Sequence, residues 1–238
     1  MRSDLFAADH LEKESEQHGM KLQSSKMLKV ELNGQMMARQ GSMVAYQGTV
    51  EFKALGAGGL GKFLKKALTG EGVPLMQLTG QGDVFLADDA SEIFVIDLED
   101  GDALSVNGKN VLAFDPTLQY DIKMVQGMGM ASNAGLFNCV FTGTGRLAIT
   151  SRGTPVVLNV DQPTYADPHA AIAWSAALRT GYHRADKLGL GTLLGRSTGE
   201  AFTMSFAGHG FVVVQPSEER PPSAQGQTQG GVSGMFGD

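Results

Sequence analysis

Hydrophobic and polar residues tend to alternate with a period of two along much of the chain. The clearest examples run from Val44 to Phe52 and from Leu112 to Met124. A period of two places successive side chains on opposite faces of a β-strand, so that one face is buried and the other meets solvent. Turn dipeptides such as Asn33-Gly34 and Asp100-Gly101 separate these stretches. The pattern therefore predicts short antiparallel strands joined by tight connections.

Helical periodicity is confined to a short insert around Lys62–Thr69. The apolar and basic side chains of this insert predict a short amphipathic helix that contacts a protein partner or a membrane surface. The candidate contact residues of this insert are Leu60, Lys62, Phe63, Leu64, Lys65 and Lys66.

A Gly-x-Gly tripeptide followed by an apolar strand occurs three times. The glycines are Gly80 and Gly82, Gly143 and Gly145, and Gly208 and Gly210. Each tripeptide stands where the chain enters a strand, which predicts a tight turn or a bulge with a positive φ angle. The alternative interpretation is a loop that cradles a ligand.

Two further patterns recur in the same order along the chain. An apolar residue, an alanine and an aromatic residue form Val44-Ala45-Tyr46, Leu112-Ala113-Phe114 and Ile172-Ala173-Trp174. An apolar run opens each repeat, at Leu28–Leu32, Phe94–Leu98 and Val156–Val160. Three patterns in a fixed order at nearly constant spacing predict three tandem antiparallel β units. These units cover about residues 27–90, 91–153 and 154–215.

The predicted domain organisation is a triplicated all-β domain between two polar flanks. Residues 1–26 form a polar N-terminal segment, and residues 27–217 form the β domain. Residues 218–238 are rich in Gly, Gln and Pro, which is typical of a flexible tail. A chain with internal threefold repetition also favours a symmetric homo-oligomer.

Composition and charge narrow the function further. The net charge of −6 and the absence of a long basic stretch make nucleic acid an unexpected partner. No apolar stretch of signal-peptide length opens the chain, so we expect a cytoplasmic location. The single cysteine, Cys139, excludes an intramolecular disulfide, and its apolar surroundings in the sequence predict a buried core residue.

No sequence motif indicates catalysis, a metal or a cofactor. Residues 56–63 match seven positions of a phosphate-binding loop, but Phe63 stands where Mg²⁺ binding requires Ser or Thr. The five histidines are not spaced as metal ligands. We therefore expect a protein that is not an enzyme and that holds no cofactor or metal.

The motifs, taken together, resemble the altered inheritance of mitochondria protein 24 family in its bacterial form. The resemblance covers about residues 20–217 and rests on Ala38–Tyr46, Thr69–Gly72, Val111–Phe114, Thr142–Gly145 and Gly208–Phe211. It implies a fold like that of the trp RNA-binding attenuation protein, with tandem β units in a double-stranded β-helix or sandwich. It also implies a homo-oligomer such as a trimer. Mitochondrial members are linked to inner-membrane organisation, while bacterial members offer no established activity to transfer.

The sequence thus favours a non-enzymatic, oligomeric scaffold or interaction protein. One alternative is a small-ligand-binding module, with sites between β units near the Gly-x-Gly loops. The other is a peripheral membrane protein that acts through the amphipathic insert.

Overall fold

The computed structural model describes residues 11–13, 19–55, 73–124, 137–184 and 202–217. Within these ranges the chain forms sixteen β-strands and one short 3-10 helix, Gly108–Asn110. The strand pairs are antiparallel throughout. The all-β prediction is therefore confirmed. The predicted helical insert lies outside the described residues.

The first group of strands consists of long hairpins. Its members are β1 (Gly19–Ser24), β2 (Met27–Arg39), β3 (Met43–Ala54) and β4 (Leu75–Leu86). β4 lies between β2 and β3 and pairs with both along nearly its whole length, and β1 pairs with the start of β2. β1 falls within the segment that the sequence assigned to a polar flank. Because Met20 is buried in the core, this strand is part of the β structure.

The second and third groups each contain six shorter strands. The second consists of β5 (Glu92–Leu98), β6 (Ala103–Asn107), β7 (Val111–Phe114), β8 (Gln119–Met124), β9 (Phe137–Thr142) and β10 (Gly145–Ser151). The third consists of β11 (Val156–Val160), β12 (Thr164–Ala166), β13 (Ala171–Ser175), β14 (Arg179–Arg184), β15 (Phe202–Ala207) and β16 (Gly210–Val214).

Strand pairing follows the same scheme in the second and third groups. In the second group, β10 pairs with β5 and β7, while β9 pairs with β6 and β8. In the third group, β16 pairs with β11 and β13, while β15 pairs with β12 and β14. The two groups therefore correspond strand for strand.

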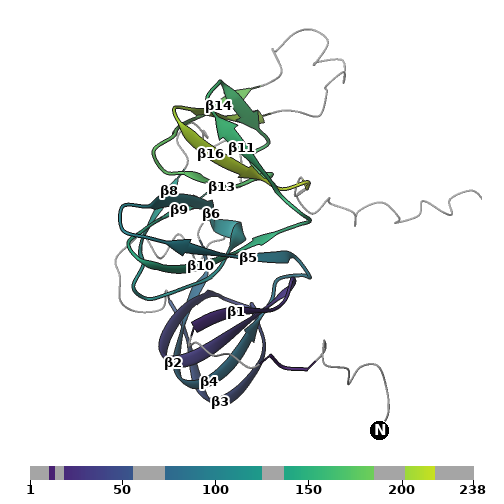
Figure 1. Cartoon of the computed structure of the whole chain (residues 1–238), viewed down its shortest axis with the longest axis vertical. Coiled ribbons are helices and arrows are strands. Elements are labelled where there is room, and N and C mark those ends of the chain that lie inside the picture. Colours follow the sequence, from purple (N-terminus) through teal and green to yellow (C-terminus); the bar gives the residue numbers. More distant parts are fainter. Residues whose placement is uncertain (1–10, 14–18, 56–72, 125–136, 185–201, 218–238) are drawn as a thin grey trace, which may run out of the picture.

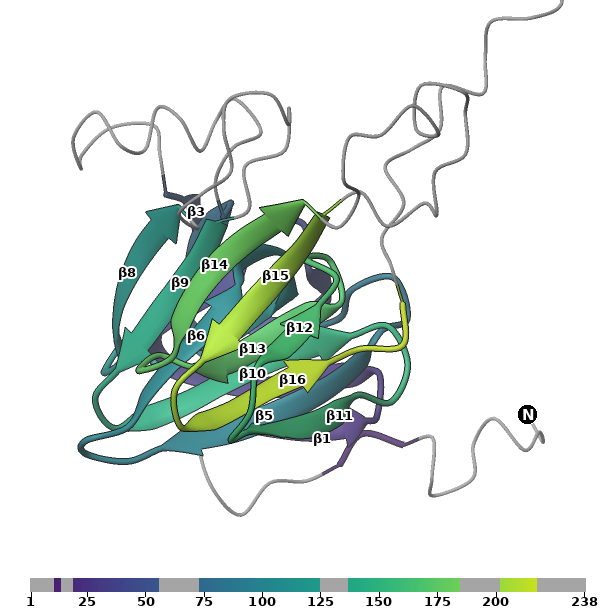
Figure 2. The same cartoon turned by 90° about the horizontal axis from the view of Figure 1, so that it is seen from above.

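Sheets pass from one group to the next. The strand order of the first sheet is β3-β4-β2-β7-β10-β5, so it joins the first group to the second. The order of the second sheet is β11-β16-β13-β6-β9-β8, so it joins the third group to the second. The remaining sheet, β12-β15-β14, contains strands of the third group only. The groups follow one another along the long axis of the molecule (Figure 1) and overlie one another when seen from above (Figure 2).

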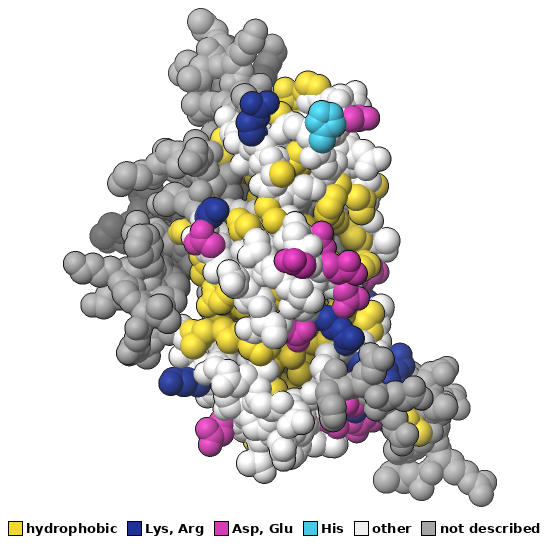
Figure 3. Space-filling model, turned by 60° about the vertical axis from the view of Figure 1, so that its left-hand side comes forward, with side chains coloured by type: hydrophobic (Ala, Val, Ile, Leu, Met, Phe, Trp, Pro, Cys, Tyr) yellow, Lys and Arg dark blue, Asp and Glu magenta, His cyan; other side chains and the backbone are white. Residues whose placement is uncertain are grey.

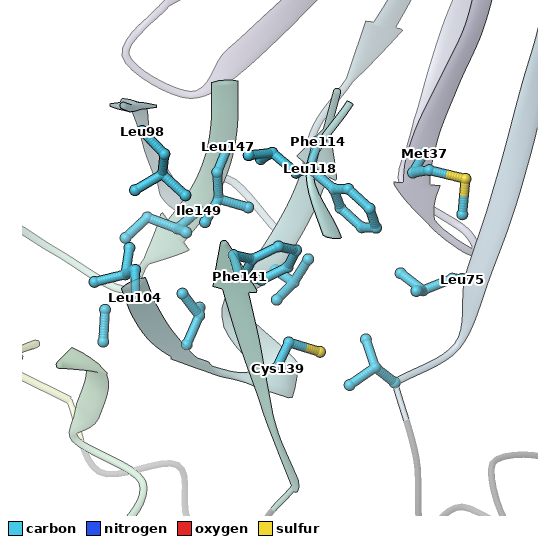
Figure 4. Close-up of a cluster of buried hydrophobic side chains, with 14 of the residues drawn as sticks. Met37, Leu75, Leu98, Leu104, Phe114, Leu118, Cys139, Phe141, Leu147 and Ile149 are labelled. Atoms are coloured by element: carbon cyan, nitrogen blue, oxygen red, sulfur yellow. The ribbon is translucent and has the colours of Figure 1, made fainter. Parts of the chain in front are cut away.

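Buried apolar side chains form three clusters, one within each group. The first cluster includes Leu112 and Ala148 from the second group, and the second cluster includes Ile172 from the third. In the second cluster, Phe141 packs edge-on against Phe114, with Cys139 beside them (Figure 4). Each of these two cores is therefore completed by residues of the following group.

Glycines mark the middle of the long strands of the first group. Gly80 of β4 stands opposite Gly34 of β2, and both have a positive φ, of 125° and 115°. A Cβ atom at Gly80 would overlap the carbonyl oxygen of Thr49 on β3, whereas one at Gly34 would meet nothing within 4 Å. The close approach of β3 and β4 therefore requires glycine at position 80.

This difference predicts a graded response to alanine. Gly34→Ala should lower the free energy of unfolding by about 1 kcal/mol, because an L-residue is strained at positive φ. Gly80→Ala has the same strain and must also displace a neighbouring strand, so it should cost about 2 kcal/mol more. Chemical denaturation of both variants measures this, and equal losses would show that strand approach is not the constraint.

Candidate interaction edges

The strands that carry the alanine–aromatic tripeptides are built alike. In β3, β7 and β13 the pairing with the neighbouring strand skips one residue, which is Val44, Leu112 and Ile172 respectively. A skipped residue on one strand is a β-bulge, which bends the strand and re-aims the side chain. The apolar residue of each tripeptide therefore occupies the same place in its group.

Burial differs sharply among these equivalent positions. Leu112 and Ile172 have no exposed surface, whereas 54% of Val44 is exposed. The aromatic residues behave in the same way, since Phe114 and Trp174 are buried and Tyr46 is 48% exposed. The first copy of the tripeptide is thus an apolar surface, while the other two are core.

The cause of the difference is a second strand neighbour. β7 pairs with β10 and also with β2, where Ala113 stands opposite Ala38. β13 pairs with β16 and also with β6, where Ala173 stands opposite Val106. The first half of β3 pairs with β4 alone among the described strands, so it ends its sheet. We call Met43–Tyr46 the β3 edge.

A second edge lies in the third group. β12 pairs with β15 and ends the three-stranded sheet, and the side chain of Tyr165 on it is 57% exposed. On the neighbouring β11, Val156 and Leu158 are also exposed. Among the described residues, the third apolar cluster has seven buried members, against fourteen and fifteen in the other two. It is therefore the smallest of the three clusters in the part of the chain that the structure describes. We call Thr164–Ala166 the β12 edge.

The two edges belong to groups at opposite ends of the long axis (Figure 1). The groups that contain them are separated by the whole of the second group. The two edges of one copy therefore lie apart, and no described strand of the same copy covers either of them.

The buried side chain of Lys29 on β2 lies among carboxylates of the N-terminal residues, of β2 and of β4. Its Nζ lies 2.7 Å from a carboxylate oxygen of Glu12, 3.3 Å from one of Asp83 and 3.6 Å from one of Glu31. Lys29 Nζ also donates a hydrogen bond to the carbonyl oxygen of Lys13. Lys29 thus binds the described N-terminal residues to the first group of strands.

The pKa values of two carboxyl groups in this cluster are shifted in opposite directions. Hydrogen bonding to Lys29 lowers the pKa of Glu12 below its ordinary value. Burial raises the pKa of Asp83, and the neighbouring Glu12 carboxyl raises it further. The folded protein therefore favours a charged Glu12 and disfavours a charged Asp83.

The six glycines named from the sequence all have positive φ angles, but they lie in different settings. Gly80 and Gly82 are inside the continuous strand β4, whereas Gly143 and Gly208 lie in the bends before β10 and β16. The insert residues, Leu60 to Lys66, lie outside the described ranges.

The remaining side chains that could react or bind a metal do not form a site in the described residues. Cys139 is buried, and burial raises its pKa to about 12, so its thiol stays protonated at neutral pH. The described residues contain no group of three His, Cys, Asp or Glu side chains that could hold a metal ion. Nor does the described part contain a helix long and apolar enough to span a membrane. On the face shown in Figure 3, acidic side chains gather near the middle beside a few basic ones.

The two edges were not found from the sequence. The tripeptide Val44-Ala45-Tyr46 was recognised, but its pattern is the same as that of its buried counterparts. Exposure at this place depends on which strand lies alongside, and the residues of a single strand do not show that.

The opposite pKa shifts of Glu12 and Asp83 predict different effects of two similar substitutions. Glu12→Gln removes a charge that the fold stabilises, and at this partly exposed site it should lower the unfolding free energy by at most about 1 kcal/mol. Asp83→Asn removes a charge that burial disfavours, so stability should stay unchanged or rise. Thermal unfolding at neutral pH compares the two, and a larger loss for Asp83→Asn would contradict the assignment.

Comparison with known proteins agrees with this architecture. The family model described as "Mitochondrial biogenesis AIM24" matches residues 20–217. An uncharacterized protein of Streptococcus pyogenes serotype M6 is 30% identical over 200 residues, and the match covers 78% of this chain and 78% of that one. The crystal structure of a Streptococcus pyogenes protein superposes with a TM-score of 0.62 at 23% identity, over 84% of this chain and 92% of that one. This structural likeness shows the fold alone. The resemblance inferred from the motifs is confirmed by the family match: the chain belongs to the mitochondrial biogenesis AIM24 family.

Proposed function

We propose that this protein is a non-enzymatic scaffold whose copies assemble head to tail through the β3 and β12 edges. The observation that carries the proposal is the exposure of Val44, which occupies the same bulge as the fully buried Leu112 and Ile172. Two of the three equivalent strands are covered within the chain. A second copy of the chain would cover the third in the same manner.

The exposure of apolar side chains on an edge strand supports the proposal that this edge is covered in the assembly. An exposed strand edge with large apolar side chains is a ready template for pairing, and natural proteins protect such edges or use them. The β3 edge exposes Met43, Val44 and Tyr46. These side chains sit on a well-formed strand that needs no rearrangement to accept a partner, which lowers the entropic cost of association.

The placement of the edges supports a head-to-tail assembly. An interface between two different surfaces of the same chain produces a ring if the rotation closes and a filament if it does not. A ring of three copies agrees with the trimer that the family resemblance implies. In this proposal the three groups of strands act as tandem units, and the assembly continues their order from one copy to the next. The cytoplasmic location remains a prediction.

A structural role also agrees with the use of reactive side chains. The thiol of Cys139 is protonated and enclosed in the second core. The ammonium group of Lys29 is neutralised by surrounding carboxylates. The Cys139 thiol contributes to core packing, and the Lys29 ammonium group forms ion pairs. Both therefore have structural roles, which agrees with a scaffold that acts through its two edges.

Sedimentation of the full chain tests the proposal. The wild-type protein should form assemblies of more than one copy, with a mass above the 25.2 kDa of a single chain. Val44→Lys should weaken assembly at least about tenfold, because a lysine at a closed apolar interface must be desolvated without a partner. Its fold should remain intact, since position 44 is exposed in the single chain.

Val157→Lys is the matched control. Val157 is 59% exposed and lies on β11, but its side chain points to the opposite face from Val156 and Leu158. This variant should assemble like the wild type. A wild-type protein that sediments as a single chain, or equal effects of the two substitutions, would overturn the proposed scaffold.

A further inference from the structure

We infer that the β3 edge of one copy pairs antiparallel with the β12 edge of the next, with Ala45 opposite Ala166 and Tyr46 opposite Tyr165. The inference rests on the proposed scaffold function and specifies its interface strand by strand. It follows from a register that occurs twice within the chain and from the surfaces left over at the two ends.

The two internal junctions share one register. The alanine of the tripeptide faces Ala38 at the first junction and Val106 at the second. The next residue, the aromatic one, faces the residue before, so that Phe114 stands opposite Met37 and Trp174 opposite Ser105. Each junction is therefore centred on the alanine of its tripeptide.

The receiving position has an equivalent on β12. On their other side, Ala38 pairs with Met76 and Val106 pairs with Cys139. Met76 and Cys139 each lie four residues before the first glycine of a Gly-x-Gly tripeptide. In the third group, Met204 holds that place before Gly208, and its partner is Ala166. Ala166 is thus the counterpart of Ala38 and Val106, and it lies on an edge strand.

Joining the edges would complete the shortest sheet. The second sheet consists of three strands of one group and three of another, joined where β13 meets β6. The sheet β12-β15-β14 has only its own three strands. Adding β3, β4 and β2 of a second copy at β12 gives the order β2-β4-β3-β12-β15-β14. This order reproduces the second sheet, with β3 in the place of β13 and β12 in the place of β6.

The same contact would close the third core. In the second group, Phe94 and Ile96 are partly buried against a cluster to which Val213 of the next group also packs. Val213 stands opposite the alanine of its tripeptide, and Phe85 stands opposite Ala45 in the same way. A second copy would therefore bring Phe85 towards β11 of the third group.

The exposed residues of β11 match this expectation. Val156 and Leu158 hold the places of Phe94 and Ile96, because both strands pair with the strand that follows a Gly-x-Gly. They are 52% and 36% exposed in the single chain. Contact with Phe85 of a second copy gives these two side chains the cover that their counterparts already have.

Disulfide trapping of paired cysteines tests the register. Ala45→Cys and Ala166→Cys are placed on separate chains and mixed, and Tyr46→Cys with Tyr165→Cys forms a second pair. Neighbouring cross-strand pairs alternate between hydrogen-bonded and non-hydrogen-bonded geometry, so one of the two pairs has the shorter separation that suits a disulfide. The native Cys139 is buried and does not compete.

The expected result is a covalent dimer in the mixture and not in either variant alone. It should form at least about tenfold faster than in a control mixture of Ala45→Cys and Val157→Cys, because seated thiols have a high effective concentration. Sedimentation of the unmodified protein is measured in parallel, so that assembly and register are judged separately.

Three outcomes would overturn the inference. Assembly without cross-linking of either pair would reject this register and leave the scaffold proposal standing. Rapid cross-linking of Ala45→Cys with itself would indicate two β3 edges paired around a twofold axis. A wild-type protein that remains a single chain would reject both the inference and the scaffold proposal.

Discussion

The strand pair between one group and the next holds the described molecule together. At the first junction, Ala38, Ala113 and Ala148 stand side by side on three adjacent strands, and none of them has exposed surface. The small side chains leave room for larger neighbours such as Leu112 to enter the first core. A strand at this position needs backbone partners on both sides and apolar cover on both faces, and the rest of the architecture follows from that requirement.

Shared cores are the direct consequence. Because the two larger sheets each take strands from two successive groups, the first and second clusters contain residues of the following group. No described group follows the third, and its cluster of described residues is the smallest. No described group precedes the first, and its tripeptide is exposed. The same rule of pairing thus accounts for the small cluster in the third group and the apolar edge in the first.

Glycine supports this arrangement differently in each group. In the first group, Gly48, Gly80 and Gly82 lie in the middle of continuous strands and permit close approach of β3 to β4. In the later groups the strands are interrupted at the matching place, and Gly143 and Gly208 lie in bends. A similar tripeptide therefore serves a long hairpin in one group and a pair of short strands in the others, according to whether the neighbouring strands are continuous.

The sequence by itself determined the all-β class, the order of the repeated motifs and the burial of Cys139, because these depend on local periodicity and on side-chain polarity. It also placed the six Gly-x-Gly glycines where a positive φ occurs. It did not identify the strand nature of β1, whose apolar content is limited to Met20 and Leu22. Nor did it separate Val44 from Leu112 and Ile172, since the three tripeptides have the same pattern. Only the tertiary structure decided that difference, because burial at these positions is set by a strand from another part of the chain, and no described strand lies beside Val44 on that side.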